Sequence, residues 1–396
     1  MSIEKINSWN NIILGDCCKE KPSYGINAAA VEFNEELPRY IRITDIDDYG
    51  RFSPNKLTSV NEKGWEDFIL KKDDVLFVRT GSTTGKSYLY QEKDGELVYA
   101  GFLIKFSVDK TILLPYYLKL FTESSFYNQW VSVMSVRSGQ PGINSKEYSL
   151  LPIHLPPLKE QKEIAKILST WDEAIETTQS LIEKLQFRKK GLMQELLSGK
   201  KRLAGFSEQW EILRGDELFA SISNKKHDGK FEVLSATQDK GVIPRSETGI
   251  NIKYDKKSLG NYKKIEIGDF VISLRSFQGG IEYSNYEGLV SPAYTVLREN
   301  LPIAKRFYQE YMKTENFINR LNSIIYGIRD GKQISYKEFG SLKFEYPPLS
   351  EQKAISKIID LSDIEISEKK AYLLQLKNQK KGLMQQLLTG KKRVKL

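Results

Sequence analysis

The segment RTGSTTGKSYLY at residues 79–90 carries the residues that come nearest to nucleotide chemistry. A phosphate-binding P-loop needs the pattern G-x-x-x-x-G-K-[ST] between a strand and a helix, so that backbone N–H groups can wrap a phosphate. Here Gly81 and Gly85 enclose three residues, one fewer than that loop requires, and the following YLYQEK is strand-like. The pattern therefore argues against nucleotide hydrolysis and favours a polar turn that offers side chains to a phosphate backbone or a base edge.

Other catalytic patterns are missing from the sequence. A DNA adenine methyltransferase needs an Asn- or Asp-Pro-Pro-aromatic stretch and a glycine-rich cofactor loop, but both Pro-Pro pairs, at 156–157 and 347–348, are followed by Leu, and no G-x-G-x-x-G occurs. His154 and His227 have no nucleophile or carboxylate spaced for a triad, and the two adjacent cysteines lack metal-ligand spacing. We predict no catalytic residue, no metal site and no cofactor in this chain.

The composition indicates a soluble protein of two or three domains with a polyanionic partner. Of 396 residues, 40% are hydrophobic and 28% are charged, and no apolar run approaches the roughly 18 residues of a membrane span. The first residues lack the layout of a signal peptide, so we expect a cytoplasmic location. The formal net charge of +9 suggests nucleic acid as the partner.

A long internal repeat organises the chain. KKGLMQELLSGKKR at 189–202 returns as KKGLMQQLLTGKKR at 380–393, with 12 of 14 residues identical, and the offset of 191 holds from Ile143 and Ile334 onward. PPLKEQK and PPLSEQK stand at the start of the two copies. A period this long indicates duplicated domains and excludes a solenoid.

Each copy continues into a helix with an apolar seam. Positions that step by four and three from Ile164 to Leu196 are apolar at eight of ten places, and the matching positions from Ile355 to Leu387 at seven of ten. Sustained 4-3 spacing is typical of a coiled coil, and about 40 residues form a rod of about 60 Å. We expect the two helices to pair with each other; the alternative is that each lies on its own neighbouring domain.

The predicted seam and partner-binding positions include two glycines inside the helices, where Gly costs about 1 kcal/mol relative to Ala. Their recurrence suggests the close approach of another chain, and an inherited kink explains it nearly as well. The full set is Ile164, Leu168, Trp171, Ile175, Ile182, Leu185, Gly191, Ile355, Ile359, Ile366, Leu373, Leu376 and Gly382.

The segments between the repeats differ from each other while keeping similar landmarks. DDVLFVRT and GDFVISLR are strand-like runs that end in Arg, and each segment opens with a Trp followed by Gly-Asp. RYIRITDIDDYGRFS at 39–53 nevertheless has its nearest counterpart in FEVLSATQDKGVIPR at 231–245. We predict two α/β domains related in fold, 1–155 and 203–346, and two repeat helices, 156–202 and 347–396.

Two divergent domains alternating with helices whose ends are near-identical, with LPPLKEQKEIAKIL and YPPLSEQKAISKII at the helix starts and KKGLMQ(E/Q)LL(S/T)GKKR at the ends, resemble the specificity subunit of a type I restriction-modification system. The resemblance implies an α+β protein in which two mixed α/β target recognition domains are separated by two long antiparallel coiled-coil helices, with a pseudo-two-fold internal repeat. It also implies that each domain reads one half of a split double-stranded DNA target.

The same resemblance implies the partners. The helices would set the spacer between the half-sites and dock two modification subunits, which bind S-adenosylmethionine and methylate adenine. Restriction subunits would supply the ATP- and Mg-dependent motor and nuclease, and this chain itself would be no enzyme. The alternative from another class is a free-standing two-domain DNA-binding or coiled-coil scaffold protein.

Polar loops of both domains supply candidate DNA contacts, because Arg, Gln, Asn, Ser and Thr reach base edges and Lys and Arg neutralise phosphates. The alternative for each loop is a solvated surface turn. In the first domain the candidates are Arg79, Ser82, Thr84, Lys86, Arg137, Gln140 and Asn144. In the second domain they are Arg275, Ser276, Gln278, Arg329, Lys332 and Gln333.

Overall fold

A computed structural model describes residues 9–249, 256–274, 276–324 and 334–396 of the protein. The chain divides into two units, of which unit 1 comprises Met1–Gln179 and Ala371–Leu396 and unit 2 comprises Ser180–Lys370. The two divisions fall 191 residues apart, at equivalent positions of the repeat. Each unit therefore combines one variable domain with part of each long helix.

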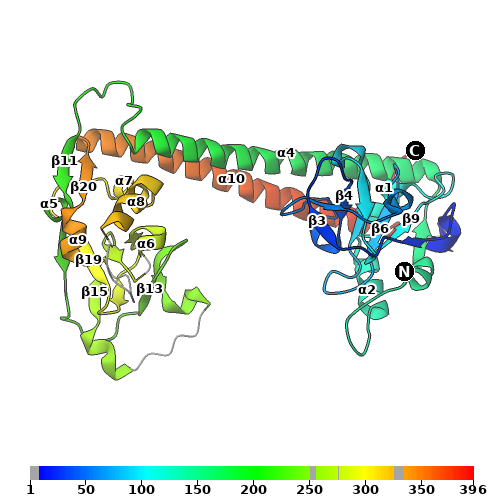
Figure 1. Ribbon diagram of the computed structural model, residues 1–396, viewed down its shortest axis with the longest axis horizontal. Coiled ribbons are helices and arrows are strands. Elements are labelled where there is room, and N and C mark those ends of the chain that lie inside the picture. The colour runs from blue at the N-terminus through cyan, green and yellow to red at the C-terminus, as the bar shows by residue number, and fades with distance from the viewer. Residues whose placement is uncertain (1–8, 250–255, 275, 325–333) are drawn as a thin grey trace, which may run out of the picture. The chain divides into compact units, whose positions relative to one another are not determined.

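Unit 1 is built on a four-stranded antiparallel sheet in the order β2-β9-β6-β7. Figure 1 labels its two inner strands, β9 and β6. These strands are Ser23–Tyr24, Leu103–Phe106, Val75–Val78 and Ser87–Leu89. Strand β6, with the sequence VLFV, is buried along its whole length, which suits its β-branched and aromatic residues. A second sheet has the order β3-β5-β4-β8, with strands Ala30–Glu32, Thr58–Val60, Arg39–Ile41 and Leu97–Tyr99.

Unit 2 repeats the first sheet with the order β12-β19-β16-β17. These strands are Phe219–Ile222, Thr295–Glu299, Phe270–Ile272 and Glu282–Tyr283. Two further antiparallel pairs belong to this unit: the hairpin of β13 (Leu234–Thr237) with β14 (Gly241–Pro244), and the pair of β15 (Lys263–Ile265) with β18 (Gly288–Val290). The shared order of four strands confirms that the two variable domains are related in fold.

An antiparallel strand pair closes each variable domain immediately before its Pro-Pro. In unit 1, β1 (Asn10–Ile13) pairs with β10 (Pro152–Leu155), and in unit 2, β11 (Glu211–Arg214) pairs with β20 (Lys343–Tyr346). Because the pair joins the first and last strands of the domain, the entry and exit of the chain are held side by side at the start of each long helix.

Short helices complete both domains, and several begin at a Ser, Thr or Asn whose side chain accepts a backbone N–H, as expected of an N-cap. In unit 1 they are α1 (Pro115–Phe121), α2 (Ser125–Met134) and α3 (Ser145–Ser149). In unit 2 they are α5 (Gly215–Leu218), α6 (Ser276–Gly279), α7 (Lys305–Tyr311), α8 (Glu315–Ser323) and α9 (Tyr336–Ser341). Short 3-10 helices span Leu14–Cys17, Ile43–Asp45, Trp65–Phe68, Glu92–Asp94, Arg245–Thr248 and Lys256–Asn261.

The repeats form two helices of 39 residues each, α4 (Leu158–Leu196) and α10 (Leu349–Leu387). In each unit the start of one helix lies beside the end of the other, so the pair is antiparallel, as Figure 1 shows. In unit 1, Ile164 and Leu168 of α4 share a core with Leu387 of α10. The expected pairing is confirmed, and the alternative contributes as well, because these same residues also pack into the domain core.

The predicted seam positions are buried along both helices, including Ile175 and Ile182 on α4 and Ile366 and Leu373 on α10. Trp171 is half-buried. The seam glycines are different, because no described atom outside the immediate backbone lies within 4 Å of a Cβ added at Gly191 or Gly382. The described part of the chain therefore does not itself make the close approach that these glycines suggested.

Two lysines interrupt the apolar seam at equivalent positions, and each is bound by an aspartate of the other helix. In unit 1, Lys380 Nζ lies 2.7 Å from Asp172 Oδ1 and 2.9 Å from Glu123 Oε2. In unit 2, Lys189 Nζ lies 2.6 Å from Asp363 Oδ1. Burial alone would lower the pKa of Lys380, but the two carboxylates outweigh that effect and hold the pKa above its ordinary value.

A buried glutamate at the start of each helix is bound by an arginine that follows the end of the other helix. In unit 1 the Arg–Glu–Trp cluster consists of Glu160, 1% exposed, with Arg393 Nε 2.5 Å from Oε1 and Trp9 Nε1 3.0 Å from Oε2. Arg393 also lies over the Trp9 ring, 5.5 Å from its centroid. The fork of the guanidinium and the indole N–H together satisfy a carboxylate that has lost its water.

The Arg–Glu–Trp cluster of unit 2 repeats this arrangement. Arg202 donates to both oxygens of Glu351 at 2.7 and 2.6 Å, and Trp210 Nε1 donates to Oε2 at 2.8 Å. Gly199, with φ +67°, turns the chain after α4, and a Cβ there would lie 3.0 Å from the Trp210 ring. This turn needs glycine both for its left-handed backbone and for the approach of the indole.

We predict that Arg393→Met lowers the free energy of unfolding of the isolated chain by about 2 kcal/mol, because it leaves the buried Glu160 carboxylate without its charged partner. Chemical denaturation followed by tryptophan fluorescence measures the change. Lys392→Met, at the exposed neighbouring position, is the matched control and should change stability by less than about 0.5 kcal/mol. Adding Glu160→Gln to Arg393→Met should restore part of the loss. Superimposable curves for wild type and Arg393→Met would contradict the assigned role of the cluster.

Candidate nucleic-acid interface

The two candidate loops of the first domain lie against each other in unit 1. Thr80 forms a bridge with Gly142, Gly81 N donates to Pro141 O at 3.1 Å, and Ile143 N donates to Arg79 O at 2.8 Å. One loop joins the buried strand β6 to β7 and the other leads into α3, so rigid elements position both of them. Residues about 60 positions apart in sequence are thereby brought into one polar surface.

Three predicted contact residues use their side chains to hold these loops together. Thr84 Oγ1 donates to Gly81 O at 2.7 Å. Arg137 forms two bonds of 2.6 Å to Glu147 and also donates to two backbone carbonyls. Asn144 caps α3 by accepting from Glu147 N at 3.0 Å. These hydrogen bonds hold the backbone of the loops, so the three side chains shape the loop surface.

Arg79 is oriented by an aromatic ring. Its guanidinium lies 4.8 Å from the centroid of the Tyr24 ring, and its Nη1 donates to Gly101 O at 3.5 Å. The hydroxyl of Tyr24 in turn accepts from Ser145 N at 3.0 Å, so one ring links strand β2 to the second loop. A stacked arginine keeps part of its donor fork free for a base edge or a phosphate.

Lys86 forms an ion pair within the surface. Its Nζ lies 2.7 Å from Asp48 Oδ1 and 3.4 Å from Ile46 O, which ties the turn after β4 to the loop after β6. The ammonium of Lys86 lowers the pKa of Asp48, whose side chain is 87% exposed. Any phosphate that reaches Lys86 must therefore compete with a carboxylate.

Ser82 and Gln140 are exposed at the meeting of the two loops, as are Arg137 and Asn144. A Cβ added at Gly81 would lie 3.3 Å from Gln140 Nε2, so the amide of Gln140 extends over that turn. An amide and a hydroxyl in this position can donate and accept together, which is what base edges require.

In unit 2 the structure separates two neighbouring candidates. Ser276 is 1% exposed, and its Oγ accepts from Ser273 N at 2.9 Å, so its hydroxyl stabilises the turn before α6. Gln278 is exposed and accepts from Gln238 Nε2 at 3.2 Å. The remaining predicted residues, Arg275, Arg329, Lys332 and Gln333, lie outside the described residues.

Three residues that the sequence did not single out take part in these surfaces, namely Tyr24, Asp48 and Gln238. Gln238 lies in the segment FEVLSATQDKGVIPR, and nothing in that segment indicates its contact with Gln278. Nothing local in the sequence indicates that Tyr24 lies under Arg79, because their contact depends on how β2 is placed in the sheet.

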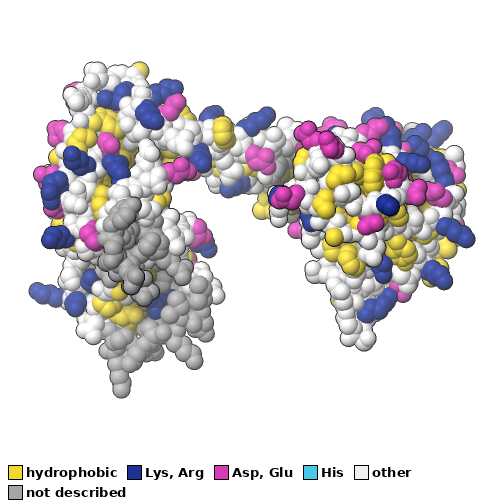
Figure 2. Space-filling model, in the orientation of Figure 1, with side chains coloured by type: hydrophobic (Ala, Val, Ile, Leu, Met, Phe, Trp, Pro, Cys, Tyr) yellow, Lys and Arg dark blue, Asp and Glu magenta, His cyan; other side chains and the backbone are white. Residues whose placement is uncertain are grey.

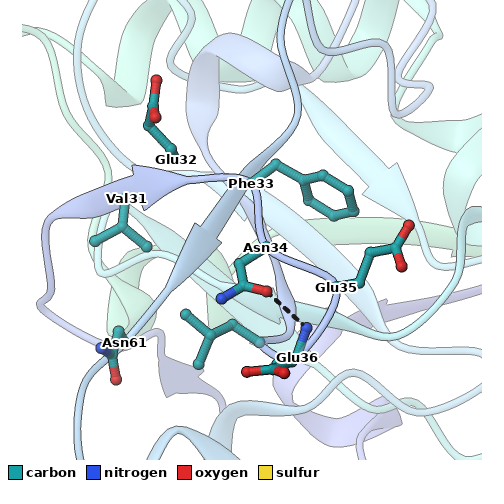
Figure 3. Close-up of a pocket in the computed structure, with 8 residues that line it drawn as sticks. Val31, Glu32, Phe33, Asn34, Glu35, Glu36 and Asn61 are labelled. Atoms are coloured by element: carbon teal, nitrogen blue, oxygen red, sulfur yellow. Dashed lines mark hydrogen bonds between the residues drawn. The ribbon is translucent and has the colours of Figure 1, made fainter.

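A hollow on unit 1 is unsuited to a phosphate backbone. Val31, Phe33, Leu37 and Asn61 line it together with three glutamates, Glu32, Glu35 and Glu36 (Figure 3). Asn34 Oδ1 accepts from Glu36 N at 3.0 Å and holds the turn. The carboxylates would repel a polyanion, so the hollow does not belong to the candidate interface.

Charges of both signs are interspersed on the face seen in Figure 2, so no uniformly cationic surface marks the interface there. Among the described residues, no helix is long and apolar enough to cross a membrane, and no three His, Cys, Asp or Glu side chains are grouped to hold a metal ion. The loop geometry is therefore the main guide to the interface.

The comparisons with known proteins agree with the fold. The family described as type I restriction modification DNA specificity domain matches residues 7–186 and again 207–378. The chain is 27% identical to the type I restriction enzyme MjaVIII specificity subunit of Methanocaldococcus jannaschii, over 98% of this chain and 93% of that protein. It is also 27% identical to the EcoKI specificity subunit of Escherichia coli K12, over 78% and 70% of the two chains.

A solved structure extends the agreement to the fold. The type I restriction-modification system S subunit from M. genitalium superposes with a TM-score of 0.54, at 18% identity, over 98% of each chain. The family matches twice and covers most of the residues, once in each half of the internal duplication. The resemblance seen in the repeats is confirmed, and this chain belongs to the family of type I restriction-modification DNA specificity subunits.

Proposed function

We propose that residues 1–155 and 203–346 are two target recognition domains, each reading one half of a bipartite DNA target, and that α4 and α10 set the spacer between the half-sites. The observation that carries this proposal is the duplication itself. Two domains of one fold differ in their surface loops, while the helices that join them have the same length and nearly identical ends. This is the arrangement expected of two different readers on one scaffold.

The specificity subunit is itself non-catalytic and assembles with other subunits. We propose two modification subunits, one for each half of the repeat, and restriction subunits in the full complex. S-adenosylmethionine, ATP and Mg would be held by those partners. The bare helix surface at Gly191 and Gly382, where an added Cβ meets open space, supports docking of a partner chain at these two equivalent places.

Within each reader we propose a division of labour. Ser82, Gln140 and Gln278, which are exposed, would contact base edges, and Lys86 and Arg79 would contact phosphates or bases at the rim. Arg275, Arg329, Lys332 and Gln333 remain predicted DNA contacts of the second domain. Arg137, Thr84, Asn144 and Ser276 would act indirectly, by holding the loops.

The first test replaces residues 203–346 with the matching domain of a relative. One half of the methylated motif should change and the other half should stay the same, because the β11–β20 pair makes the domain a closed module on the helix pair. Sequencing that detects methylated adenine in the host genome measures the motif of each variant. The reciprocal exchange of residues 1–155 is the control and should change the other half. A change in both halves from either exchange would overturn the two-reader proposal.

The second test lengthens both helices at equivalent places, with four residues inserted after Gln179 and four after Lys370. This adds about 6 Å and rotates each helix by only about 40° beyond a full turn, so the seam stays in register. At about 3.4 Å per base pair, one or two spacer positions should be added with both half-sites unchanged. Inserting two residues at each place instead swings the seam by about 200° and should abolish assembly. An unlengthened spacer in an active four-residue variant would exclude the helices as the ruler.

The third test concerns the ion pair of Lys86. Asp48→Asn frees the ammonium for phosphate, so the assembled methyltransferase should bind non-specific DNA more tightly, with the slope of log K against log salt steeper by about 0.9. Glu92→Gln removes the same charge from an exposed pair with Lys72 and serves as the matched control, with no such change in slope. Equal effects of the two variants would show that Lys86 does not contact the backbone.

A further inference from the structure

Two exposed glutamine side chains from different elements of unit 2 meet in a hydrogen bond. Gln238 stands in the turn between β13 and β14, Gln278 lies on α6, and Gln238 Nε2 donates to Gln278 Oε1 at 3.2 Å. We infer that this glutamine pair reads an adenine base in the half-site bound by residues 203–346. The inference rests on the proposed two-reader function and names one specificity-determining element of it.

Hydrogen bonds of Thr237 hold the turn that carries Gln238. Thr237 Oγ1 donates to Gly241 O at 2.9 Å and accepts from Lys240 N at 3.2 Å, so the ends of the turn are tied together. Gly241 has φ +74°, and a Cβ there would lie 2.7 Å from Tyr283 O. The hairpin therefore lies directly against strand β17, and its tip has little freedom to shift.

The element that carries Gln278 is fixed as well. Besides accepting from Ser273 N, the buried Ser276 accepts through its carbonyl from Gly280 N at 2.8 Å, which closes the single turn of α6. This turn follows the central strand β16 of the sheet. Two independently anchored elements thus bring the two amides together, and their contact restricts both side chains before DNA arrives. Because the two side chains are already restricted, they lose less conformational entropy when they bind DNA.

The groups that remain free on the pair match adenine. After the shared hydrogen bond, Gln238 keeps its carbonyl oxygen as an acceptor, and Gln278 keeps both N–H groups as donors. In the major groove adenine offers the N6 amino group as a donor and N7 as an acceptor, so one acceptor and one donor are what its edge needs. Guanine offers two acceptors there, and its O6 would face the Gln238 carbonyl oxygen.

Electrostatics of the site favour base reading over phosphate binding. Lys313 Nζ lies 3.4 Å from Gln238 O, but it also forms an ion pair of 2.5 Å with Glu282. Burial raises the pKa of Glu282, against the opposing effect of Lys313. At the tip, the exposed Asp239 and Lys240 carry opposite charges. The neutral amides are therefore set among balanced charges, which supply little general affinity for a polyanion.

The matching place in unit 1 carries different chemistry. There the turn after β4 is tied to the loop after β6 by the ion pair of Asp48 and Lys86. Asp48 lies in RYIRITDIDDYGRFS, and the nearest counterpart of that segment, FEVLSATQDKGVIPR, contains Gln238. One contact between the same two parts of the fold is ionic in one unit and an amide pair in the other. A difference in chemistry between the two contacts is expected if both lie on the DNA-binding surface and the two half-sites have different sequences.

The test maps methylated motifs for the chain assembled with its modification subunits. Gln238→Ala and Gln278→Ala should each relax the same single A·T position of the half-site that exchange of residues 203–346 identifies, with methylation of sites bearing another base there rising roughly tenfold. Gln238→Asn, which keeps the amide on a shorter side chain, should relax that position too. The salt slope of DNA binding should stay unchanged, because no phosphate contact is removed.

Lys240→Ala, in the same exposed turn, is the matched control and should leave the motif as it is. The inference is overturned if the Gln238 and Gln278 variants keep the wild-type motif, relax a G·C position, or relax the half-site of the other domain. A uniform drop in methylation at all sites would also overturn it, because that is the effect of a structural role. A wild-type complex that methylates no bipartite motif would instead refute the proposed function.

Discussion

The buried carboxylates of Glu160 and Glu351 impose the constraint on which the rest of the molecule depends. Each has lost nearly all contact with water, and a charge in that position is tolerated only when it is paired and hydrogen-bonded. The partner arginine comes from the end of the other repeat in both cases. Neither copy of the repeat can therefore satisfy its own glutamate.

This reciprocity explains why the repeats have stayed so similar. A change in the Glu of one copy removes the partner of the Arg in the other, so the PPLxEQK and GKKR segments are linked across the duplication. The same holds for the seam, where Lys189 needs Asp363 and Lys380 needs Asp172. A polar contact inside an apolar seam also fixes the register of the two helices, since sliding by one turn would leave a buried lysine unpaired.

The helices and their pairing could be predicted from the sequence because their signal is local and periodic. The 4-3 spacing from Ile164 onward marks the face that is buried. The glutamate clusters could not be predicted, although Glu160 and Arg393 are plain in the sequence, since charged residues abound in any exposed helix. Only the three-dimensional pairing of one helix start with the other helix end shows which carboxylate is buried.

The candidate interface was harder to predict for a related reason. Residue type shows which side chains can form hydrogen bonds. It does not show whether their donors and acceptors are already bonded to other residues of the same chain. Arg137 and Asn144 are good DNA-binding types by identity, yet both are engaged by Glu147. Gln278 and Ser276 are two positions apart, and burial alone separates the exposed amide from the hydroxyl that holds its turn.

Substitutions in the loops and in the helices therefore have different consequences for the fold. Lys86 lies on a loop and Gln278 on the short helix α6, and neither side chain contacts an Arg–Glu–Trp cluster. The antiparallel strand pairs β1–β10 and β11–β20 end each domain before its helix begins, which further separates the reading surface from the buried carboxylates. On the proposed two-reader function, a new half-site would require substitutions on exposed turns, whereas a substitution at Glu160 or Glu351 removes the buried partner of an arginine in the helix pair that both domains share.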